Sequence, residues 1–127
     1  MDKTLSSGRT VLIAEDSVAQ RRFLEILLSK DGHNVVSFED GFTALQFLEH
    51  NVPDLIVMDV NMPYVNGLEA SETIKRQERL RHIPIILLSS FKEDISDSML
   101  ETAGADVFIT KPLVSKAFRE LTHTYLN

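Results

Sequence analysis

The chain contains no cysteine and no tryptophan, and its 127 residues include only four prolines. Without thiols, disulfide bonds, zinc–thiolate sites and cysteine nucleophiles are excluded, and a reducing compartment is favoured. Long hydrophobic runs are missing as well, since none approaches the roughly 20 apolar residues that cross a bilayer. The polar stretch from Met1 to Thr10 has no apolar segment of the kind a signal peptide carries. We therefore expect a cytoplasmic protein that does not insert into a membrane.

Positive charge is in the minority, because 13 Lys and Arg residues stand against 19 Asp and Glu, for a formal net charge of -6. The summed negative field repels DNA and anionic lipid, so direct binding to nucleic acid is not expected. A hydrophobic fraction of 43% and a charged fraction of 25% are typical of a soluble globular domain. The length suits one domain, which we expect over residues 10–127 after a disordered or flexible tail over residues 1–9.

Short, continuous apolar runs predict strands that are covered on both faces, as in a parallel sheet. A weaker run with partial alternation predicts an edge strand. The continuous runs are residues 11–14, 55–58, 85–88 and 107–109, and the weaker run is residues 34–38.

Five segments with apolar residues at steps of three and four follow these runs and predict helices. The first is expected to end near Gly32, and the second to begin with Asp40 as its cap. The third is predicted from Gly67 to about Arg79, the fourth over about 93–103, and the fifth from about Pro112. The repeating positions are Val18, Phe23, Ile26, Leu27 and Lys30 in the first helix, and Leu113, Ala117, Leu121 and Tyr125 in the last.

A strand followed by a helix thus occurs five times in succession. This order predicts an α/β fold of the (βα)5 type, with a doubly wound parallel five-stranded sheet covered by helices on both faces. The chain is too short for an eightfold barrel. In open sheets of this kind, ligands bind at the carboxyl ends of the strands.

Polar side chains stand where the apolar runs end. Glu15 and Asp16 follow the first run, Asp59 and Ser89 follow the third and fourth strands, and Lys111 follows the fifth. Since the carboxyl ends of parallel strands meet at one edge, these side chains should gather there. Clustered carboxylates repel one another, and a hard divalent cation such as Mg²⁺ relieves that repulsion. With a cation, an ammonium and a hydroxyl to neutralise phosphoryl oxygens, one carboxylate could attack phosphorus as a nucleophile.

This ordered set resembles the receiver domain of two-component response regulators, of the CheY-like kind. The resemblance runs from about Thr10 to Tyr125. It implies a flavodoxin-like topology with strand order 2-1-3-4-5. It also implies a signalling phosphoacceptor that takes its phosphoryl group from a histidine kinase or a histidine phosphotransfer protein, and assists its own phosphorylation and dephosphorylation without being an enzyme. The residues that carry it are Glu15-Asp16, Asp59 with Met62-Pro63 and Gly67, Ser89, and Lys111-Pro112.

The resemblance further implies a metal site around the phosphoacceptor Asp59. Mg²⁺, or Mn²⁺ in its place, would be bound by Asp16, by Asp59 and by the backbone carbonyl of Asn61, with Glu15 acting through water. Glu15 stands where relatives more often carry Asp, which lengthens the side chain.

Lys111 and Ser89 would hold the phosphoryl oxygens, and the Lys111–Pro112 peptide bond is expected to be cis. Ser89 would act with Phe108 as the switch, although Phe108 lacks the hydroxyl of the frequent Tyr. The bulky Phe91 stands where many relatives are polar. The switch would reshape a face made by the fourth helix, fifth strand and fifth helix. That face would bind a downstream partner or output domain, and a homodimer is a further option.

The same residues allow other interpretations. A haloacid-dehalogenase-like phosphatase uses a second Asp two residues after the nucleophile, where this chain has Asn61. Flavin binding of the flavodoxin kind needs a phosphate-binding loop after the first strand, where Glu15 and Asp16 would repel the phosphate. An unphosphorylated pseudo-receiver that serves as an interaction module stays open, and so does the choice between a stand-alone receiver and a piece of a larger protein. The stretch from Glu15 to Ser17 could also cap the first helix.

Overall fold

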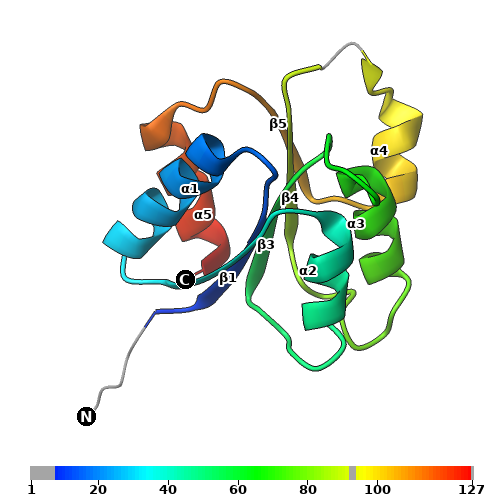
Figure 1. Cartoon of the computed structure of the whole chain (residues 1–127), viewed down its shortest axis with the longest axis horizontal. Helices are drawn as coiled ribbons and strands as arrows, with labels where there is room; N and C mark the ends of the chain where they lie inside the picture. Colours follow the sequence, from blue (N-terminus) through cyan, green and yellow to red (C-terminus); the bar gives the residue numbers. More distant parts are fainter. Residues whose placement is uncertain (1–7, 92–93, 127) are drawn as a thin grey trace.

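A computed structural model describes residues 8–91 and 94–126 of the chain. In these residues, five parallel strands form one sheet in the order β2-β1-β3-β4-β5, with helices on both faces (Figure 1). The predicted α/β fold and strand order are confirmed. Most of the predicted N-terminal tail, residues 1–7, lies outside the described residues. The elements are β1 (Thr10–Ala14), α1 (Val18–Lys30), β2 (Asn34–Phe38), α2 (Gly41–Phe47), β3 (Leu55–Asp59), α3 (Gly67–Lys75), β4 (Ile85–Ser89), α4 (Asp97–Ala103), β5 (Val107–Thr110) and α5 (Ser115–Leu126).

Two hydrophobic cores lie on opposite faces of the sheet. Helices α1 and α5 cover one face, and α2, α3 and α4 cover the other (Figure 1). Along β1, Val11 and Ile13 belong to the core under α1 and α5, while Leu12 and Ala14 belong to the other core. Successive side chains of a strand point to opposite faces, so a strand covered on both faces is apolar throughout. This explains the continuous apolar runs of β1, β3 and β4.

The run over residues 107–109 is covered on both faces as predicted, but less completely than the other runs. Val107 and Ile109 pack against one core and Phe108 against the other, and all three are only half-buried. Strand β5 lies at the edge of the sheet, beside β4 alone, so one of its sides is open. The predicted edge strand, β2, lies at the opposite edge.

The buried face of α1 differs from the predicted one. Val18, Phe23 and Ile26 are exposed, and the buried residues are Leu24, Leu27 and Leu28. The helix is rich in leucine and isoleucine, so two overlapping stripes satisfy the same three- and four-residue spacing. Contact with the sheet selects the second stripe.

Helix α5 shows the same kind of offset. It begins at Ser115, so Pro112 lies in the preceding loop and not in the first turn as predicted. Phe118, Thr122 and Leu126 are the buried residues, and they lie one position beyond the expected stripe. Of the predicted positions, Leu113, Leu121 and Tyr125 are half-buried against the same core, and Ala117 is exposed.

One predicted helix cap is confirmed, whereas the predicted end of α3 and the predicted start of α4 are wrong. Asp40 caps α2 as predicted, with its carboxylate 2.7 Å from the amide nitrogen of Thr43. Helix α3 ends at Lys75 and not near Arg79, because the chain then turns to bury Leu80 in the core. Helix α4 begins at Asp97, later than predicted, and the expected start at residue 93 lies outside the described residues.

Candidate functional site

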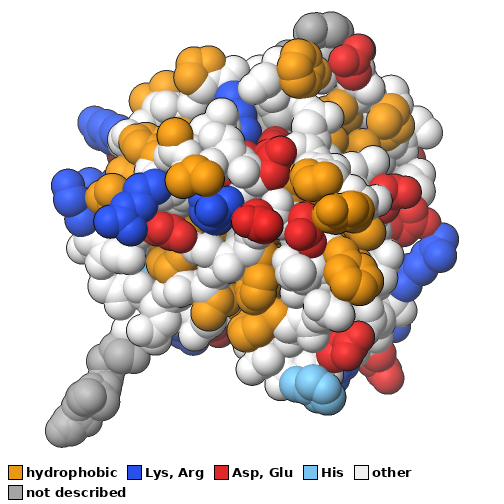
Figure 2. Space-filling model, in the orientation of Figure 1, with side chains coloured by type: hydrophobic (Ala, Val, Ile, Leu, Met, Phe, Trp, Pro, Cys, Tyr) orange, Lys and Arg blue, Asp and Glu red, His pale blue; other side chains and the backbone are white. Residues whose placement is uncertain are grey.

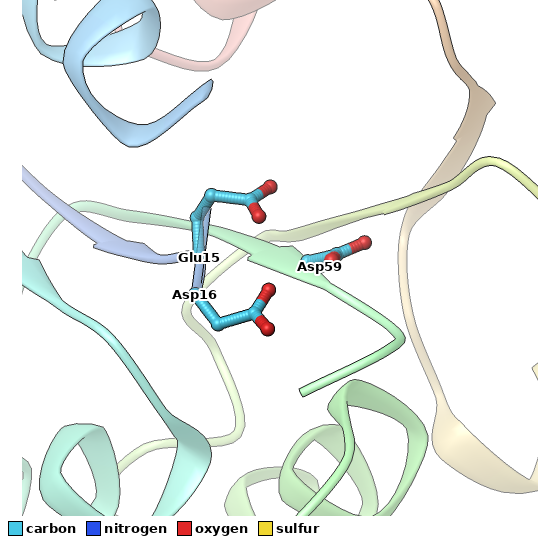
Figure 3. Close-up of side chains that lie close together, drawn as sticks. All are labelled: Glu15, Asp16 and Asp59. Atoms are coloured by element: carbon cyan, nitrogen blue, oxygen red, sulfur yellow. The ribbon is translucent and has the colours of Figure 1, made fainter. Parts of the chain in front are cut away.

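Three carboxylates meet at the carboxyl edge of the sheet. Glu15 and Asp16 follow β1 directly, and Asp59 is the last residue of β3, the neighbouring strand. Figure 3 shows the three side chains directed into a common space. One oxygen from each lies within 4.8 Å of the others. Glu15 and Asp59 are buried and Asp16 is exposed, so the cluster opens to solvent on the Asp16 side.

The environment of Asp59 disfavours its negative charge. Burial, and after it the charge of Glu15, raise the pKa of Asp59 to about 6 against the opposing effect of Lys111. The local positive charge is therefore too small to balance the carboxylates. Carboxylate oxygens that lie so near one another, with too little positive charge to balance them, fit a hard divalent cation.

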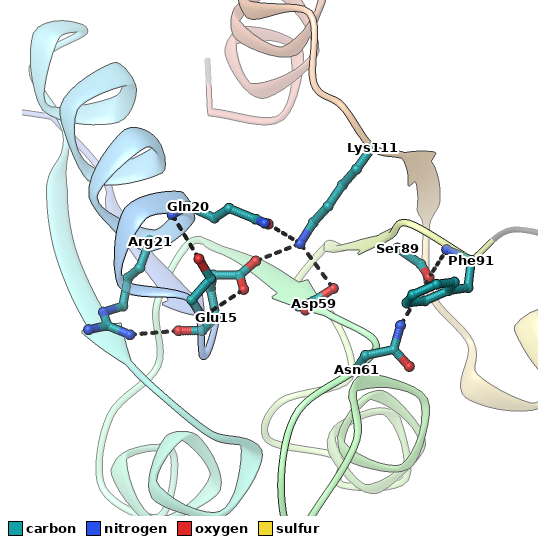
Figure 4. A network of polar contacts seen from close by, with 9 residues as sticks. Glu15, Gln20, Arg21, Asp59, Asn61, Ser89, Phe91 and Lys111 are labelled. Atoms are coloured by element: carbon teal, nitrogen blue, oxygen red, sulfur yellow. Dashed lines mark hydrogen bonds and ion pairs between the residues drawn. The ribbon is translucent and has the colours of Figure 1, made fainter.

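Lys111 reaches the same cluster from the loop after β5. Its Nζ lies 2.9 Å from Oε1 of Glu15 and 3.3 Å from Oδ1 of Asp59, and it also donates a hydrogen bond to Oε1 of Gln20 (Figure 4). The peptide bond between Lys111 and Pro112 is cis. The ammonium thus bridges two carboxylates and one amide.

Ser89 ends β4 and lies to one side of Asp59, fully buried. Its Oγ accepts hydrogen bonds from the backbone amide of Phe91 at 3.0 Å and from Nδ2 of Asn61 at 3.4 Å (Figure 4). The hydroxyl is therefore held by its local neighbours in this conformation. Phe108 is not part of this group, because its half-buried ring packs on the core beneath α2, α3 and α4.

The loop after Asp59 is held close to the sheet by Gly67. A Cβ atom on Gly67 would lie 2.4 Å from the carbonyl oxygen of Asp59, so only glycine allows this approach. The amide of Gly67 donates to the carbonyl oxygen of Val60 at 2.9 Å. Helix α3 thereby starts directly against the end of β3, which fixes the backbone around Asp59.

Sequence reasoning missed two residues at this site. Gln20 and Arg21 lie in the first turns of α1, and Arg21 donates from Nη1 to the backbone oxygen of Glu15 at 2.8 Å. Neither residue stands at the end of a strand, so the rule that found the others could not find them. The one available signal was the capping stretch, since Ser17 does cap α1 and directs its first turn over the strand ends.

The surface around the cluster is mixed in character. Figure 2 shows acidic side chains near the middle of this face, between the two groups of helices, with hydrophobic side chains around them. Among the described residues, no helix has the length and apolar character needed to cross a membrane.

Residues 11–123 match the family model of the response regulator receiver domain. The chain belongs to this family. The resemblance to receivers of two-component systems is thereby confirmed over nearly the whole domain.

Similar proteins agree with this assignment. The receiver domain is 31% identical over 118 residues to the polar-differentiation response regulator DivK of Brucella ovis, covering 93% of this chain and 96% of the relative. It is 34% identical to the receiver domain of a signal transduction histidine kinase from Syntrophus aciditrophicus, with a TM-score of 0.84 over 93% of this chain and 89% of that one. It is 26% identical to the receiver domain of a sensor histidine kinase from Pseudomonas aeruginosa PAO1, with a TM-score of 0.85 over 94% and 98% of the two chains; that structure has a magnesium ion coordinated in its active-site cleft.

Proposed function

We propose that Asp59 of this receiver domain accepts a phosphoryl group from the phosphohistidine of a sensor kinase or of a histidine phosphotransfer protein. The observation that carries the proposal is the setting of Asp59, buried at the end of β3 between Lys111 and two further carboxylates. A carboxylate oxygen of Asp59 attacks phosphorus, the bond from phosphorus to the imidazole nitrogen breaks, and that nitrogen keeps the electron pair. The domain thus assists its own phosphorylation and dephosphorylation, without acting as an enzyme on a separate substrate.

The acidic cluster fits Mg²⁺, or Mn²⁺ in its place. Asp16 and Asp59 would bind the ion directly together with the backbone carbonyl of Asn61, and Glu15 would act through water. When bound, the ion would supply positive charge to the phosphoryl oxygens. The magnesium in the cleft of the Pseudomonas aeruginosa receiver supports this choice.

Lys111 and Ser89 hold the phosphoryl oxygens in this proposal. Lys111 already contacts the accepting carboxylate, whereas Ser89 must first give up its hydrogen bonds from Asn61 and Phe91. Movement of Ser89 toward the phosphoryl group lets Phe108 pack inward, which gives a two-state switch.

The switch is proposed to act on the face formed by α4, β5 and α5. That face would bind a downstream protein or an output domain, or a second copy of the chain. Strand β5 pairs with β4 at Ser89, and the chain after Ser89 leads to α4, so a rearrangement of Ser89 can reach this face. We also propose a cytoplasmic location for the protein, which the cysteine-free sequence favours.

Phosphorylation with a small donor tests the assignment directly. The protein is incubated with phosphoramidate and Mg²⁺, and intact-mass spectrometry measures the gain of one phosphoryl group. We expect the gain in the wild type and in Asp97→Asn, a matched change at an exposed carboxylate of α4, and none in Asp59→Asn or in excess chelator. An equal gain in Asp59→Asn would mean that another residue is the phosphoacceptor.

The two alternative functions, a phosphatase and an unphosphorylated pseudo-receiver, make different demands on this site. A phosphatase of the haloacid-dehalogenase type needs an acid two residues after the nucleophile, whereas Asn61 donates from its amide to Ser89 there. A pseudo-receiver would give no mass gain with any donor, so the same experiment separates it from the proposal.

A further inference from the structure

We propose that Gln20 is a positioning residue that holds the ammonium of Lys111 in place for phosphoryl transfer. The inference rests on the proposed function of Asp59 and adds to it a residue of α1. Gln20 accepts a hydrogen bond from Lys111 Nζ through its side-chain oxygen (Figure 4). The two residues are 91 positions apart in the chain, so the contact is made only by the fold.

The hydrogen-bonding capacity of Lys111 defines the role of Gln20. An ammonium has three N–H donors, and Lys111 has three acceptors within reach, on Glu15, Asp59 and Gln20. Its side chain is only 12% exposed, but Gln20 itself is exposed. Water that replaced Gln20 would satisfy the third donor without holding it in a fixed direction. Removal of Gln20 therefore leaves one direction of the ammonium unrestrained.

The three acceptors behave differently when a phosphoryl group arrives. The Asp59 oxygen becomes part of the acyl phosphate, so the contact of Lys111 with Asp59 passes to a phosphoryl oxygen. Glu15 and Gln20 are the two acceptors that persist before and after transfer. Two fixed acceptors define the position of the ammonium much better than one, because a single contact permits rotation of the long side chain about it.

The chemistry of glutamine suits this position better than that of glutamate. The site already holds the carboxylates of Glu15, Asp16 and Asp59 against the single charge of Lys111. A neutral amide adds an acceptor without a further negative charge to repel the incoming phosphoryl group. Gln20 thus orients Lys111 and leaves its charge available.

The backbone places Gln20 and Glu15 as a pair. The Ser17 amide donates to Oε2 of Glu15 at 3.1 Å, and the Ser17 hydroxyl accepts from the Gln20 amide at 3.3 Å. One capping residue therefore contacts both the carboxylate of Glu15 and the backbone from which the Gln20 side chain extends. Gln20 also lines a cavity of about 630 Å³ together with Phe23 and Lys111, and among the three acceptors it is the exposed one.

Two substitutions separate the acceptor from the charge. Gln20→Met keeps the length of the side chain and removes the acceptor, whereas Gln20→Glu keeps the acceptor and adds a negative charge. Gln46→Met, at an exposed glutamine of α2, is the matched control. Three quantities are measured for each protein: the rate constant of phosphorylation by phosphoramidate with Mg²⁺, the Mg²⁺ dissociation constant by calorimetry, and the ¹H–¹⁵N signal of the Lys111 ammonium.

We expect Gln20→Met to lower the rate constant about three- to tenfold, the effect of one hydrogen bond, while the Mg²⁺ dissociation constant stays within about twofold. The Lys111 ammonium signal should broaden or vanish in Gln20→Met and return in Gln20→Glu, although the rate constant of Gln20→Glu stays low because of its added charge. Gln46→Met should match the wild type in all three measurements.

An unchanged rate constant in Gln20→Met overturns the proposal, whatever the ammonium signal does. A loss of Mg²⁺ affinity as large as the loss of rate overturns it too, because it would assign Gln20 a general structural role. Failure of the proposed function looks different, since the wild type itself would then take up no phosphoryl group on Asp59.

Discussion

The negative charge of Asp59 lowers the stability of the folded protein. Its pKa of about 6 lies above its usual value of 3.8, chiefly because the carboxyl is buried. The folded state therefore binds the proton more tightly than the unfolded chain does. The resulting stabilisation is complete below pH 3.8 and is lost as the pH rises to about 6, after which the ionised carboxylate destabilises the fold by a constant amount.

Replacement of Asp59 by Asn should therefore stabilise the protein at neutral pH. We expect the free energy of unfolding in chelator at pH 7 to rise by about 1 to 3 kcal/mol, since one pKa unit corresponds to about 1.4 kcal/mol. At pH 3.5 the gain should disappear, because the wild-type carboxyl is protonated there. Urea denaturation at both pH values measures this. A gain of equal size at pH 3.5 would show that packing, and not charge, is the cause.

At the scale of single elements, the sequence predicted which segments form strands and helices better than it predicted their faces. The strand ends that carry Asp59 and Ser89 follow from short apolar runs, which leave little choice of boundary. In α1, however, Phe23 and Leu24 are equally apolar, and only the sheet decides which of them is buried. The contact of Gln20 with Lys111 could not be predicted for a related reason. It joins α1 to the loop after β5, and a contact between distant segments leaves no local pattern in the sequence.

The junction of β3 and α3 depends on Gly67, and its substitution gives a second prediction. Gly67→Ala should lower the free energy of unfolding by about 2 kcal/mol or more, because the added Cβ would meet the carbonyl oxygen of Asp59 at 2.4 Å. Gly32→Ala is the control. A Cβ atom on Gly32 would meet nothing within 4 Å, but the backbone of Gly32 has a φ of +86°. It should cost about 1 to 2 kcal/mol from backbone strain alone.

Phosphorylation rates separate the two glycine variants more sharply than stability does. Gly67→Ala displaces the backbone that presents Asp59, so phosphorylation by phosphoramidate should slow even under conditions where the variant is fully folded. Gly32 follows α1 at the other end of the strands, so Gly32→Ala should keep the wild-type rate constant. Equal rate constants in both variants would argue against the role of the α3 start in placing Asp59.

At the scale of the whole molecule, the site is a product of topology. Glu15, Asp59 and Lys111 lie far apart in the sequence, and the parallel sheet brings them together because it ends its strands at one edge. This is why the membership of the cluster could be predicted before the structure. The distances, the burial of Glu15 and the resting position of Ser89 depend on packing between elements, and the sequence does not encode those locally.

A cation bound at this edge should stabilise the entire fold by mass action. At a Mg²⁺ concentration 100 times the dissociation constant, we expect the free energy of unfolding to rise by about 2.7 kcal/mol relative to chelator. Asp16→Asn should abolish this rise and leave the stability in chelator nearly unchanged, since Asp16 is exposed. Asp97→Asn removes the same charge from α4 and should keep the full effect. Thermal denaturation at constant ionic strength measures all three proteins. An equal rise in Asp16→Asn would mean that Mg²⁺ binds to other carboxylates of this acidic chain, because only binding at the cluster distinguishes Asp16 from Asp97.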